Sequence, residues 1–92
     1  MKEIWIEAEE WSNEYDIYNE NSDVKVIFKD GTEAVATFIT YKNILSLREK
    51  NQANGECLSG KYFWASDMLL IEDISRETIT DVVAHLLKNN EF

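Results

Sequence analysis

The chain has few of the residues that build disulfides and membrane spans. It contains a single cysteine, Cys57, so an internal disulfide cannot form, and a reducing cytoplasm is the expected location. No stretch approaches the roughly 18 uncharged apolar residues that a membrane-spanning helix requires. The acidic N-terminal segment lacks the basic start and the apolar stretch of a signal peptide. We therefore expect a cytoplasmic protein that does not bind membranes.

Basic residues are also scarce, since 9 Lys and Arg face 18 Asp and Glu and give a net charge of −9. The first 23 residues carry eight acids against Lys2 alone, a net charge of −7 for that segment. Such a surface repels nucleic acids and anionic lipids, so we expect neither as a partner. It would attract a basic protein surface, although an excess of acids also serves solubility alone. Both interpretations are open at this stage.

No recognisable set of catalytic or metal-binding residues is present. The single histidine, His85, is predicted to face solvent, on the side of a helix away from its apolar stripe. Cys57 follows a predicted helix C-terminus, which is an unfavourable place for a reactive thiolate. The chain has no glycine-rich phosphate loop, no nucleophile elbow and no zinc-like ligand spacing. We expect no catalytic residue, no cofactor and no metal, and packing is the favoured role of Cys57.

The length and the apolar pattern predict one α+β domain over residues 1–92. The expected order is β-β-β-α-β-α, an antiparallel sheet with helices packed on one face. The first strand is predicted over residues 2–9, with Ile4, Ile6 and Ala8 on its buried side. Residues 11–18 are expected to form a loop. Its aromatic residues either fold back as a lid on the core, which is favoured, or form an exposed aromatic and acidic contact surface.

Residues 23–40 are predicted to form a β-hairpin that turns at Asp30-Gly31. A two-residue turn would pair Lys29 with Thr32, whereas a three-residue loop with Gly31 left-handed would pair Phe28 with Thr32. The second register is preferred because it gathers one apolar face, made of Val24, Val26, Phe28, Ala34, Ala36 and Phe38. The reverse face keeps Ile27, Val35 and Ile39, which either the 11–18 loop or a second copy of the chain would cover.

Capping residues place the two helices. Thr40 is the predicted N-cap of a helix that runs to about Gln52, and Gly55 suits a left-handed C-terminal position. One side of this helix is apolar, at Tyr41, Ile44, Leu45 and Leu47. Ser75 is the predicted N-cap of the last helix, which ends near Lys88 or Asn89. Its buried stripe is expected at Ile79, Val82, Val83, Leu86 and Leu87.

A strand is predicted over residues 61–72, between the two helices. Strict alternation would place the Asp67 carboxylate in a row of apolar side chains, which is energetically unfavourable. Either a bulge at Ser66-Asp67 turns this carboxylate outward, which is favoured, or the carboxylate is buried with hydrogen-bond partners.

Three segments carry a resemblance: ATFITYKNI, GECLSGKYFWASDMLLIED and SRETITDVVAHLLKNNEF. Together they resemble a group of short bacterial proteins of unknown function, a domain of unknown function with this type of central motif. The resemblance covers residues 23–92 and is less clear for the acidic first segment. It implies a compact bacterial α+β domain and implies no activity.

Three functional hypotheses follow. The first is a binding module of the inhibitor, immunity or adaptor type that recognises a basic protein surface. Its candidate partner-binding residues are Glu7, Glu9, Glu10, Trp11, Glu14 and Tyr15, with Tyr62, Trp64 and Asp67 as a second group suited to a cationic surface. Core packing is nevertheless the favoured explanation for Tyr62 and Trp64. The alternatives are a small-molecule or enzymatic site around Cys57, Trp64 and Asp67, and a homodimer through Ile27, Val35 and Ile39.

Overall fold

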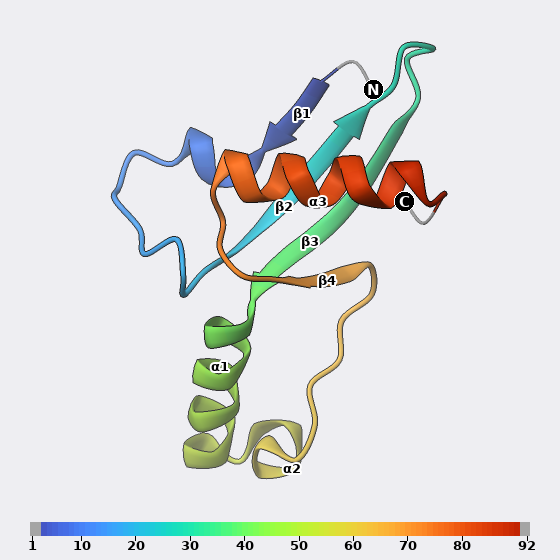
Figure 1. Cartoon of the computed structure of the whole chain (residues 1–92). Coiled ribbons are helices and arrows are strands. Elements are labelled where there is room, and N and C mark those ends of the chain that lie inside the picture. Colours follow the sequence, from blue (N-terminus) through green and yellow to red (C-terminus); the bar gives the residue numbers. More distant parts are fainter. Residues whose placement is uncertain (1–2, 91–92) are drawn as a thin grey trace.

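The computed structural model describes residues 3–90 and has the predicted α+β class (Figure 1). Its elements are β1 (Glu3–Ile6), the 3-10 helix η1 (Glu7–Glu10), β2 (Asn21–Ile27), β3 (Glu33–Thr40), α1 (Tyr41–Asn54), α2 (Glu56–Gly60), β4 (Met68–Ile71) and α3 (Arg76–Lys88). The predicted order of strands and long helices is confirmed, and η1 and α2 are added to it.

The four strands lie side by side in chain order, and the sheet is mixed. β1, β2 and β3 are antiparallel, whereas β4 runs parallel to β3. The prediction of a wholly antiparallel sheet is therefore wrong. After β3, helix α1 carries the chain beyond the sheet, and residues 61–67 return it, so that β4 runs in the same direction as β3 (Figure 1).

The predicted hairpin register is confirmed. Val26 lies opposite Ala34, and Val24 lies opposite Ala36. The amide of Phe28 donates to the Thr32 carbonyl at 2.9 Å, and Gly31 has a φ of 89°. Only a residue without Cβ adopts this φ at no steric cost, so Gly31 fixes the three-residue loop.

The first strand is shorter than predicted, because β1 ends at Ile6 and residues 7–10 form η1. Ala8 is still buried, and its amide donates to the Ser22 hydroxyl at 2.9 Å. A 3-10 helix that keeps Ala8 inward continues the apolar alternation, so the pattern alone does not distinguish this helix from a longer strand. Lys2, the predicted first strand residue, lies outside the described residues.

Helix α3 lies across one face of the sheet (Figure 1). Its buried residues Ile79 and Val83 belong to one apolar cluster with Ile4, Ile6, Ala8, Val24, Val26, Phe38, Ile71 and Ile74. Val82 and Leu87 pack against this cluster and Leu86 is half-buried, so the predicted stripe is confirmed. None of the buried residues of the cluster comes from α1, which extends away from the end of the sheet (Figure 1).

Both predicted N-caps are confirmed. The Thr40 hydroxyl accepts a hydrogen bond from the Asn43 amide at 3.1 Å. The Ser75 hydroxyl accepts one from the Thr78 amide at 3.2 Å. Gly55 is left-handed with a φ of 81°, as predicted, although α1 runs on to Asn54. These local contacts depend on residues close in sequence, so the sequence pattern identifies them.

The strand predicted over 61–72 is wrong in its first part, since β4 contains only Met68–Ile71. Asp67 is exposed and has a φ of 52°, in a turn just before β4. The carboxylate therefore faces outward, as favoured, but through a turn before the strand and not a bulge within it. Alternating apolar side chains indicate an extended backbone, and they do not supply the neighbouring strand that pairing requires.

Candidate protein-binding surfaces

Acidic and aromatic side chains follow one another along η1 and the loop after it. We call this surface the acidic end, and define it by Glu7, Glu10, Trp11, Glu14, Asp16 and Tyr18, on η1 and the following loop. Trp11 and Tyr18 keep 37% and 52% of their surface exposed. Glu10 and Glu14 are exposed, and neither forms an ion pair within residues 3–90. Asp16 faces Lys42 at 3.9 Å in an exposed pair that solvent screens.

The 11–18 loop combines both predicted roles. Tyr15 is half-buried and packs against the core cluster, as the lid interpretation requires. Its ring meets the Trp11 ring edge-on, with centroids 5.1 Å apart. The carbonyl of Ile17 accepts a hydrogen bond from the Ile74 amide at 2.7 Å, which ties the loop to the start of α3. The loop is thus held by one aromatic residue and by its backbone, while Trp11 and Tyr18 remain exposed.

Glu9 is engaged within the chain and is a poor partner-binding residue. The Arg76 guanidinium donates to its two carboxylate oxygens at 2.6 and 2.9 Å. The same guanidinium also donates to the Ile4 carbonyl at 3.0 Å. The hydrogen bonds between Arg76 and Glu9 lower the pKa of Glu9 and raise the pKa of Arg76. The pair joins η1 to α3, which are far apart in sequence.

We expect Arg76→Ala to lower the free energy of unfolding by about 0.5–1 kcal/mol at neutral pH, because the pair is partly exposed and solvent screens it. The pKa of Glu9 is lower in the folded state, so its contribution is present above the unfolded pKa and is lost as pH falls through the folded pKa. Urea unfolding at about pH 7 and about pH 3 should therefore show a difference between wild type and variant that shrinks in acid. A difference of the same size at both pH values would contradict this role. Glu9→Gln removes the carboxylate but keeps the bond from Arg76 to the Ile4 carbonyl, so its loss relative to wild type should disappear in acid.

The second predicted group lies in solvent. Tyr62 and Trp64 keep 55% and 78% of their surface exposed, so core packing, the favoured explanation, is wrong for both. They share the irregular segment 61–67 with the exposed Asp67. The first backbone hydrogen bond between this segment and the sheet is at its last residue, where the Asp67 carbonyl accepts from the Thr37 amide at 2.8 Å.

Cys57 lies in α2, which is a left-handed turn. The φ angles of Cys57, Leu58 and Ser59 are 53°, 49° and 58°. Each non-glycine residue in this conformation costs about 1–2 kcal/mol. Cys57 is half-buried, and packing at a strand entry does not describe it, because β4 begins only at Met68. His85 is exposed, as predicted, on α3.

The reverse face of the sheet is partly polar. Val35 is exposed and Ile27 is half-buried, whereas Ile39 is buried. The Lys25 ammonium lies 5.7 Å from the centre of the Trp5 ring on the same face. Tyr15 of the 11–18 loop packs against the core cluster, on the face that α3 covers. Coverage of Val35 by a second copy of the chain therefore stays a prediction.

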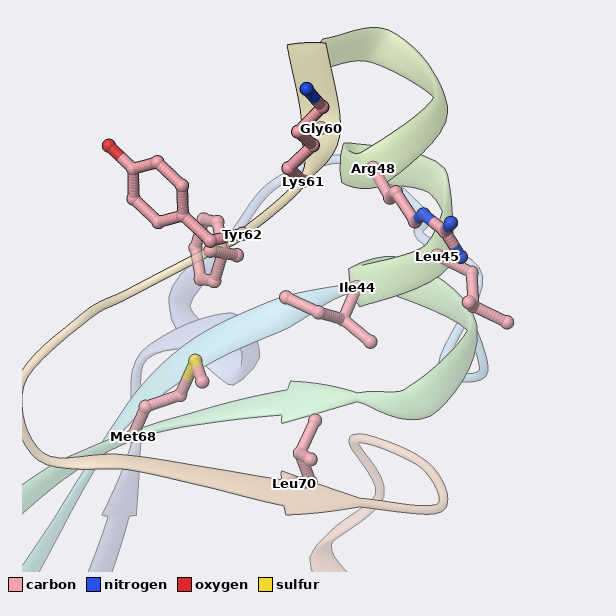
Figure 2. A pocket seen from close by; sticks show the side chains of 9 residues that line it. Ile44, Leu45, Arg48, Gly60, Lys61, Tyr62, Met68 and Leu70 are labelled. Carbon is pink, nitrogen blue, oxygen red and sulfur yellow. The ribbon is translucent and has the colours of Figure 1, made fainter. Parts of the chain in front are cut away.

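A groove that sequence reasoning missed lies between α1 and β4 (Figure 2). Its volume is about 620 Å³, and its walls are Ile44, Leu45 and Arg48 of α1, residues 60–63, and Met68 and Leu70 of β4. The signal available in the sequence is the apolar side of α1, at Tyr41, Ile44, Leu45 and Leu47. In the structure Tyr41 and Leu45 of that side are exposed.

The comparisons with known proteins add no further residues to these surfaces. No family model, no curated protein and no solved structure matches the chain. The resemblance to short bacterial proteins therefore stays an expectation. Within residues 3–90, no helix is long and apolar enough to cross a membrane. The same residues contain no group of three or more His, Cys, Asp or Glu side chains placed to hold a metal ion.

Proposed function

We propose that this protein is a small protein-binding module, of the inhibitor, immunity or adaptor type, whose acidic end contacts a basic surface of its partner. One observation carries the proposal: Trp11 and Tyr18 are exposed, and the exposed acids Glu10 and Glu14 beside Trp11 form no ion pair within the described part of the chain. Exposed aromatic side chains supply the area that interfaces bury at their centre. Uncommitted carboxylates around them attract a basic surface and accelerate association.

The other candidate residues are weaker support for this contact. Glu9 is held by Arg76, and Tyr15 is packed on the core, so the proposed contact uses Glu10, Trp11 and Glu14. A small-molecule site around Cys57, Trp64 and Asp67 is the weaker proposal. None of these three lines the groove, and Asp67 borders a separate hollow beside Leu86.

The test begins with capture of the partner by the tagged chain from a lysate of its own host, at low and at moderate salt. We expect a basic protein to be retained at low salt and lost as salt rises. Glu10→Gln with Glu14→Gln should then slow association with that protein by about tenfold at low salt. Trp11→Ala should mainly accelerate dissociation, because it removes buried contact area and no charge.

Glu49→Gln with Glu56→Gln is the matched control, since it removes the same charge from exposed acids outside the acidic end. Its association rate should stay close to that of wild type. Equal rates for the Glu10 and Glu14 variant and for wild type would contradict the proposal, and would reduce the acidic excess to a solubility device.

A further inference from the structure

The outer edge of β4 faces the groove. β4 is the last strand in the sheet order, with β3 on one side and no strand on the other within residues 3–90. Figure 1 shows that this free edge faces the space between α1 and residues 61–67. The Asp67 carbonyl points toward β3, because it accepts from the Thr37 amide. The planar trans peptide and the alternation of the ladder then direct the amides of Met68 and Leu70 away from β3.

The groove beside this edge is apolar and open. Figure 2 shows the side chains of Ile44, Met68 and Leu70 pointing toward one another across it. Leu70 and Phe63, which also lines the groove, are both exposed. An exposed apolar surface of this kind, next to an unpaired strand edge, is typical of a site for another polypeptide.

The rim of the groove is positively charged in a protein of net charge −9. Arg48 and Lys61 are its two charged residues, and no acid is among the residues that line it. Neither cation forms an ion pair within residues 3–90. In Figure 2 the two charged ends point outward on different sides of the groove, Lys61 past Gly60 and Arg48 along α1, with Ile44, Met68 and Leu70 below them. The groove is thus complementary to a segment that is apolar in the middle and acidic at its flanks.

We propose that the groove binds an extended, acidic and apolar segment of a partner protein, which adds a fifth strand at the edge of β4. The outward amides of Met68 and Leu70 donate to the backbone of the segment. Alternate apolar side chains enter the groove toward Ile44, and flanking carboxylates meet Arg48 and Lys61. This site is separate from the acidic end and does not depend on the function proposed for it.

The test uses random dodecapeptides displayed on phage. The immobilised full-length chain captures the phage that bind it, and phage that also bind the variant R48E/K61E are discarded. We expect the selected peptides to be enriched in acidic and β-branched or aromatic residues. By fluorescence anisotropy, their Kd should be at least about tenfold higher for R48E/K61E, because both rim charges then repel the peptide. The matched control K29E/K50E makes the same charge change at exposed positions outside the groove and should bind about as wild type does.

Amide hydrogen exchange measured by NMR tests the strand pairing itself. Bound peptide should slow exchange at Met68 and Leu70 by about tenfold or more, as new backbone hydrogen bonds protect them. No enriched peptide, enrichment of basic peptides, or binding that R48E/K61E leaves unchanged would overturn the proposal. So would peptides that leave both amides unprotected. A dimer seen by sedimentation that R48E/K61E dissociates would assign the groove to a second copy of the chain.

Discussion

Phe38→Ala is expected to lower the free energy of unfolding by about 3–5 kcal/mol, a large part of the about 5–15 kcal/mol that stabilises a typical domain. The Phe38 side chain is 0% exposed and is the largest fully buried one among residues 3–90. It lies in the cluster that joins the sheet to Ile79 and Val83 of α3. Its removal loses the transfer energy of the ring and leaves a cavity that neighbouring strands cannot close. Urea unfolding followed by circular dichroism measures the loss.

Phe63→Ala is the matched control, because it makes the same chemical change in a residue that keeps 40% of its surface exposed. We expect it to cost about 1 kcal/mol or less, since much of the ring is already in contact with water. Similar losses for the two variants would contradict the placement of the core under α3. The Phe63 variant should instead weaken binding of the peptides selected by the groove.

Gly60→Ala is expected to cost about 2–4 kcal/mol, the sum of left-handed strain and overpacking. Gly60 has a φ of +79°, and an added Cβ would lie 2.6 Å from Cγ of Gln52 and 2.8 Å from the carbonyl oxygen of Arg48. The Gln52 side chain is able to move, but the Arg48 carbonyl belongs to the backbone of α1. Residues 60–63 must then shift away from α1, which moves one wall of the groove. Urea unfolding and peptide binding should therefore both be impaired.

Gly55→Ala separates the two causes. Gly55 has a similar φ of +81°, but an added Cβ would meet nothing within 4 Å. Only the backbone strain remains, so we expect a loss of about 1 kcal/mol and no change in peptide binding. Equal losses at the two positions would show that residues 60–63 do not pack closely against α1.

The accurate sequence predictions concern residues that are close together in the chain. The hairpin register followed from Gly31 and from the apolar alternation on each side of it. The N-caps Thr40 and Ser75 were predictable because a hydroxyl and the amide three residues later form the bond. The buried stripe of α3 followed from the helical period alone. In each case the decisive interaction spans a few residues or a fixed repeat.

The errors concern contacts between distant segments. Nothing in residues 61–72 shows that only Met68–Ile71 find a strand to pair with, or that β4 runs parallel to β3. Ile44 and Leu45 lie on the apolar side of α1, and they border an open groove because the helix extends beyond the sheet. Core packing was favoured for Tyr62 and Trp64 because both are aromatic and lie in the predicted strand. Periodicity identifies the side chains that favour burial, and it does not identify which surface is left to cover them.

The sequence by itself determined the charge of the protein, the hairpin, the helix ends and the face of α3 that is buried, because these depend on composition and local geometry. The tertiary structure decided which candidates remain free for a partner. Arg76 reaches Glu9 across the domain and removes it from the acidic end, while Glu10 and Glu14 stay unpaired. The tertiary structure also brings Arg48 and Lys61 to a groove that is lined by Met68 and Leu70 of the edge strand β4. Both outcomes depend on how distant segments approach in space, since burial and charge pairing are settled only when those segments pack.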